Sequence, residues 1–107
     1  EALLEKALPL GAAGCISATA NVQPRAIANA LKAWGTPEFD AIQAQLKVVR
    51  NLFQSQPMIP ALKHVVGEHF ADPEWRHVRP PLMEANASWS DGLSAQLAAA
   101  GFSMGTK

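Results

Sequence analysis

Residues 11–24, GAAGCISATANVQP, decide the fold that this 107-residue sequence predicts. Within them, residues 13–18 are short, apolar and small, and turn-forming residues stand on both sides. This composition is typical of a strand buried on both faces, although periodicity alone does not separate so short a run from a buried helix segment. A buried strand needs neighbours for its backbone hydrogen bonds. The sequence therefore predicts one strand whose partner strands lie outside these 107 residues.

Helical patterns fill most of the remaining chain. Residues 1–8 are expected to be the end of a helix that Gly11 closes in the left-handed conformation. Apolar positions at spacings of three and four predict further helices over residues 21–35, 36–54, 57–70 and 88–101. We expect Asn21, Thr36 and Ser88 to be the capping residues. Residues 71–75 are expected to break the helical run, and the prolines of residues 79–82 predict an extended segment.

Composition bounds the classes of function. Hydrophobic residues make up 49% and charged residues 17%, so the chain is expected to fold as a single packed unit. Nine basic and nine acidic residues balance, which predicts no nucleic-acid partner, and no run approaches the roughly 18 apolar residues of a membrane span. One cysteine excludes an internal disulfide framework and favours a reducing, cytoplasmic location. Because the sequence begins with Glu1 and not with methionine, we expect a longer parent chain.

Few residues are candidates for chemistry. His64 and His69 lie five positions apart and so face different sides of a helix, which predicts no metal site. Polar residues directly after a barrel strand are candidates for an active site, so Thr19 and Asn21 could either serve there or only satisfy local backbone groups. Tyrosine is absent. The lysines are interpreted as surface charges, namely Lys6, Lys32, Lys47, Lys63 and Lys107.

Three motifs resemble one known family. Residues 14–22, GCISATANV, followed by Pro24, resemble the last-strand motif of the dihydrodipicolinate synthase and N-acetylneuraminate lyase family. Residues 56–63, QPMIPALK, are similar to its Asn-Pro-x-Pro-x-Lys helix start, although Gln56 replaces the common asparagine and two residues separate the prolines. Residues 79–82, RPPL, are similar to its Arg-x-Pro-Leu segment. The resemblance covers nearly the whole chain but only the C-terminal part of the family's chain.

The resemblance implies an α/β fold, a (β/α)8 TIM barrel to which this chain contributes the last strand and the C-terminal helices. Residues 1–35 would be the last helix-strand-helix of the barrel, and residues 36–107 a C-terminal helical extension. It also implies a class I aldolase, a lyase that binds pyruvate or another 2-oxo acid as a lysine Schiff base, without a cofactor. The family's Schiff-base lysine and relay tyrosine match nothing in this chain, and Lys63 aligns with a structural lysine.

Three residues are implied as substrate-binding, namely Ile16, through its backbone carbonyl, Ser17 and Thr19. No catalytic residue is expected here, and the full-length enzyme is expected to be a homo-oligomer, a dimer or a tetramer. A rival interpretation is a non-catalytic helical fragment or interaction module that is inactive by itself. A longer open reading frame upstream discriminates the two interpretations. If it encodes a lysine and a tyrosine at strand ends, it favours the enzyme, and its absence favours the module.

Overall fold

The computed structural model describes residues 1–105, and within that range the chain is helical and forms no strand. Lys107, interpreted above as a surface charge, lies outside the described residues. The α-helices and the 3₁₀ helices (η) follow in this order: α1 Leu4–Ala7, η1 Leu8–Leu10, η2 Ala18–Asn21, α2 Pro24–Ala33, α3 Phe39–Gln54, α4 Met58–Phe70, η3 Pro73–Arg76 and α5 Ala87–Ala99.

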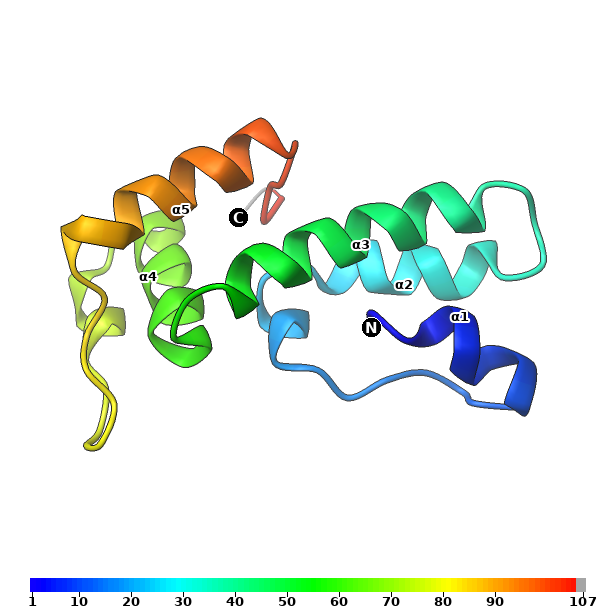
Figure 1. The fold of residues 1–107 in the computed structure, drawn as a ribbon, viewed down its shortest axis with the longest axis horizontal. Coiled ribbons are helices and arrows are strands. Elements are labelled where there is room, and N and C mark those ends of the chain that lie inside the picture. The colour runs from blue at the N-terminus through cyan, green and yellow to red at the C-terminus, as the bar shows by residue number, and fades with distance from the viewer. Residues whose placement is uncertain (106–107) are drawn as a thin grey trace.

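The long helix α3 organises the molecule. It lies beside α2 along one half of its length, and α4 and α5 pack against its other end (Figure 1). One core therefore lies between α1, α2 and the start of α3, with Leu4, Ile27 and Leu46 among its buried residues. A second core joins the end of α3 to α4 and α5, around Phe53 and Leu97. The buried positions of α3 repeat at helical spacing, which confirms the helix that the sequence predicts there.

The left-handed conformation predicted for Gly11 is confirmed, whereas the predicted capping residues Asn21, Thr36 and Ser88 are wrong. Gly11 ends η1 with a φ of 88°. The amide of Asn21 donates back to the Ala18 carbonyl at 2.9 Å, and α2 begins after Gln23 without a side-chain cap. The hydroxyl of Thr36 similarly donates to a carbonyl of the preceding helix. Asn86, two residues earlier than expected, caps α5 because its side chain accepts from the backbone N–H of Ser88 at 3.1 Å.

Two segments differ from the expected extended chain. The strand predicted over residues 13–18 does not form within residues 1–105: residues 12–17 are neither helix nor strand, and Ala18 begins η2. Figure 1 shows them as a separate run of chain between η1 and η2. The described residues contain no strand to pair with them. Residues 79–82 form a turn, closed by the Leu82 N–H to Arg79 carbonyl bond of 3.0 Å around a cis Pro80–Pro81 peptide.

Candidate functional site

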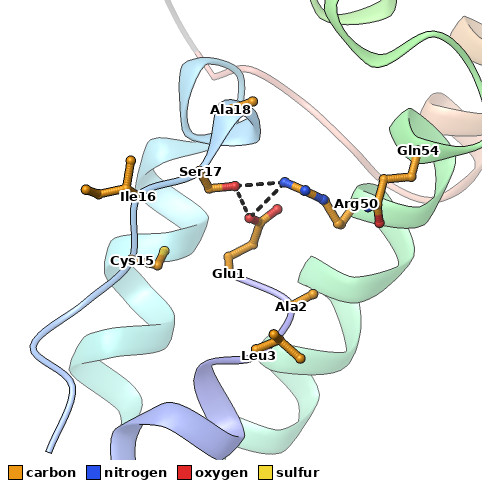
Figure 2. A pocket seen from close by; sticks show the side chains of 9 residues that line it. All are labelled: Glu1, Ala2, Leu3, Cys15, Ile16, Ser17, Ala18, Arg50 and Gln54. Atoms are coloured by element: carbon orange, nitrogen blue, oxygen red, sulfur yellow. Dashed lines mark hydrogen bonds and ion pairs between the residues drawn. The ribbon is translucent and has the colours of Figure 1, made fainter.

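A hollow of about 560 Å3 opens where the N-terminal residues, α3 and residues 12–17, here called the unpaired segment, meet (Figure 2). Segments far apart in the sequence contribute its lining. Two of the three predicted substrate-binding residues, Ile16 and Ser17, are among the lining residues. Its lining residues are Glu1, Ala2, Leu3, Cys15, Ile16, Ser17, Ala18, Arg50 and Gln54. The third predicted residue, Thr19, is completely buried beside it.

The carboxylate of Glu1 is the centre of this site. Its side chain is completely buried, although it is charged in its ordinary state. The hydroxyls of Ser17 and Thr19 both donate hydrogen bonds to it, one to each oxygen. The amide of Gln23 approaches one oxygen at 3.4 Å, and a guanidinium nitrogen of Arg50 lies 3.6 Å from the other. A buried carboxylate requires such partners, because water no longer solvates it.

Helix α3 brings Arg50 to the site through its helical spacing. Gln43, Leu46 and Arg50 follow at steps of three and four and so share one face of the helix. On this face, Gln43 donates from its amide to the backbone carbonyl of Glu1 at 3.1 Å, and Leu46 is buried in the core. One turn later, Arg50 donates to the Ser17 hydroxyl at 2.9 Å (Figure 2). Packing of α3 thus sets the position of the guanidinium.

The predicted residues take different places in this site. The hydroxyl of Ser17 faces Glu1 and Arg50, and the Thr19 hydroxyl lies 3.0 Å from that of Ser17. The side chain of Ile16 is fully exposed and points away from both charged groups (Figure 2). Their role in substrate binding stays a prediction.

Glu1 and Arg50 were not predicted as site residues. They lie 16 and 33 positions from Ser17, whose hydroxyl is hydrogen-bonded to both of them in the folded chain. The sequence feature that could have indicated them is the spacing of Gln43 and Arg50, which places two polar side chains on one face of α3. Both side chains contact Glu1 from that face.

This arrangement is suited to binding and positioning. It combines a guanidinium, a carboxylate and two hydroxyls, whereas no lysine is among the residues that line the hollow. The nearest charged pair on the same helix, Lys47 with Glu5 at 2.5 Å, belongs to the contact between α3 and α1. Residues 1–105 contain no cluster of three or more side chains arranged to hold a metal ion. None of their helices is both long enough and apolar enough to cross a membrane.

The described chain is thus helical, and its apolar residues 12–17 lead into the turn that carries Thr19. The model of the Dihydrodipicolinate synthetase family matches residues 1–100, and the chain therefore belongs to that family. Its members are in general lyases of the aldolase type, they have the TIM-barrel fold, and they typically act on 2-oxo acids and oligomerise. Neither the curated proteins nor the solved structures that were searched contain a match to this chain.

Proposed function

We propose that this chain is the C-terminal part of a (β/α)8-barrel lyase that binds pyruvate or another 2-oxo acid as a lysine Schiff base. The protonated imine is an electron sink, so that a carbanion beside it becomes an accessible enamine for aldol condensation, cleavage or dehydration. In this proposal the imine lysine and a proton-relaying tyrosine belong to earlier strands of the barrel. Residues 1–35 contribute the last helix-strand-helix, and residues 36–107 form the helical extension.

The observation that carries the proposal is the unpaired segment of residues 12–17, followed at once by a polar turn at a hollow. Its apolar composition suits the last strand of a barrel, where both faces are covered and strands on either side supply the hydrogen bonds. Active sites of such barrels lie at the carboxyl ends of the strands. Ser17 and Thr19 occupy that end of the segment and line or border the hollow.

The contribution of this chain to the reaction is positional. The Ile16 carbonyl would help to shape the imine pocket, and Ser17 and Thr19 would form the turn beside it. The buried Glu1 carboxylate accepts from both hydroxyls, and Arg50 donates to that of Ser17, so these contacts hold the turn against α3. Binding groups held at a set distance favour reaction because little reorganisation is needed at the reacting atoms.

Borohydride trapping tests the proposed reaction. The protein encoded by the complete open reading frame is mixed with pyruvate and sodium borohydride, and its intact mass is measured. We expect one reduced pyruvate adduct per chain, mapped by peptide analysis to a lysine outside these 107 residues. Acetate, which has no ketone, is the matched control and should leave the mass unchanged. An unmodified protein would refute the imine mechanism, and an adduct on Lys63 would refute the assignment of chemistry to other strands.

We also propose that the full-length enzyme is cytoplasmic and forms a homo-oligomer, a dimer or a tetramer. Sedimentation equilibrium of the encoded protein tests the oligomeric state.

The second candidate function is a non-catalytic interaction module. The solvent-exposed apolar side chains of Leu10, Ile16 and Met83 favour it, because large apolar groups on a surface are frequent contact points for partners. An open reading frame that ends at these 107 residues, with no borohydride adduct, would favour the module over the lyase.

A further inference from the structure

Two of the family-like motifs meet at a second hollow, of about 370 Å3, which no step of the proposed reaction uses. Residues 56–63 contribute Ile59 and Lys63 from the first turns of α4, and residues 79–82 contribute Arg79 and Leu82 from the turn after η3. His77 and Val78 complete the lining. Fifteen residues of chain, 64–78, separate the two motifs, so their convergence is a property of the fold.

Two cations, Lys63 and Arg79, line this hollow, and no carboxylate is among its lining residues. His77 lies between two carboxylates, with Glu74 at 3.5 Å and Glu84 at 3.3 Å. Within residues 1–105, no carboxylate lies at ion-pair distance from Lys63 or Arg79. The ammonium of Lys63 instead lies 6.0 Å from the centre of the Trp75 ring, a contact that leaves its hydrogen-bond donors unused. Glu74 and Glu84 lie beside His77, and Asp72 and Glu74 border a neighbouring hollow with Lys63, so these acids flank the site without forming an ion pair with either cation.

Apolar side chains form the rest of the lining. Ile59 is 51% exposed and Leu82 38% exposed, and both face the same hollow as the two cations. A ligand that covers these side chains gains apolar burial, and a negative group on it gains charge-assisted hydrogen bonds from the guanidinium and the ammonium. A volume of this size falls at the low end of the range of small-molecule sites.

We propose that this hollow binds a small amphipathic carboxylate, whose carboxylate contacts Lys63 and Arg79 and whose hydrocarbon chain covers Ile59 and Leu82. Arginine can hold a carboxylate with two parallel hydrogen bonds, and lysine supplies a point charge beside it. The site is separate from the hollow around Glu1, which shares none of its lining residues. The proposal therefore does not depend on the imine reaction.

The probe for the test is hexanoate, and hexan-1-ol is its uncharged counterpart. Binding to the protein encoded by the complete reading frame is measured by calorimetry and by NMR shifts of the Leu82 methyl groups. We expect saturable hexanoate binding that weakens with salt, and at least tenfold weaker binding of hexan-1-ol. Lys63→Gln and Arg79→Gln should each weaken hexanoate binding about three- to tenfold, since each removes one partly exposed charge contact. Arg76→Gln removes a cation that does not line the hollow and should leave the affinity unchanged.

Three results would overturn the proposal. Equal affinity for hexanoate and hexan-1-ol would show that the cations do not recognise the ligand. Equal effects of Arg76→Gln and Arg79→Gln would show that only the net charge matters. Tighter binding of the dipeptide N-acetyl-Ala-Leu than of hexanoate, lost when its carboxylate is amidated, would assign the site to a peptide C-terminus in place of a small molecule. Circular dichroism of each variant verifies that its helices are intact.

Discussion

Substitution of Thr19 by valine tests whether the buried Glu1 carboxylate is held as described. The substitution retains the shape of the side chain and removes its hydroxyl donor, and the Thr19 side chain is completely buried. A hydrogen bond to a charged group stabilises a protein by about 1.5–3 kcal/mol, and the added methyl group returns somewhat under 1 kcal/mol of apolar burial. We therefore expect the free energy of unfolding to fall by about 1–2 kcal/mol.

Urea denaturation followed by circular dichroism measures this loss. Thr36→Val is the matched control, because the Thr36 hydroxyl bonds at the protein surface, and its loss should cost less than the loss of the buried Thr19 hydroxyl. If Thr19 acts through the carboxylate, its substitution in a Glu1→Gln background should cost about 1 kcal/mol less than in the parent protein. Equal costs for Thr19→Val and Thr36→Val, together with no coupling to Glu1, would refute the buried carboxylate.

Further predictions concern one glycine in α4, one glycine in α5 and the start of α3. Gly67→Ala should destabilise the protein by about 1–2 kcal/mol despite the better helix propensity of alanine, because its Cβ would lie 3.0 Å from a backbone carbonyl and 3.2 Å from Trp75. Gly92→Ala, in open space on α5, should stabilise the protein by about 0.5–1 kcal/mol. Thermal melts measure both variants, and melting temperatures that shift in the same direction would contradict this account. The hydrogen bond from the Thr36 side chain lowers the pKa of Glu38 in the folded protein. The contact therefore stabilises the fold at pH values above the Glu38 pKa of the unfolded chain, and this stabilisation is lost as the pH falls through the lower pKa of the folded state. An NMR titration should show the Glu38 pKa rising toward its ordinary value in Thr36→Val, and an unchanged pKa would rule out this cause.

Much of the helical structure is predictable from sequence because helices are local. The buried residues of α3 repeat at steps of three and four, and this pattern requires no knowledge of what packs against the helix. Helix ends are less predictable, because several polar side chains compete for the same free N–H groups. At α5, both Asn86 and Ser88 are suitable caps by residue type, and the structure uses Asn86.

The unpaired segment and the site depend on long-range contacts. The composition of residues 13–18 predicts a strand, yet a strand forms only where a neighbouring strand supplies hydrogen bonds, and residues 1–105 contain no strand. The site likewise joins Glu1, Ser17 and Arg50 across 49 positions of sequence. No local pattern relates these residues, so only the packing of α3 against the N-terminal turn reveals their contact.

Hydrogen exchange of the backbone amides over residues 13–17 tests the central claim most directly. If this segment is the last strand of a barrel, its amides should be strongly protected in the protein encoded by the complete open reading frame and should exchange rapidly in the isolated 107-residue chain. The amide of Leu46, within α3, is the internal control and should be protected in both samples. Rapid exchange over residues 13–17 in both proteins, with Leu46 protected, would contradict the barrel account.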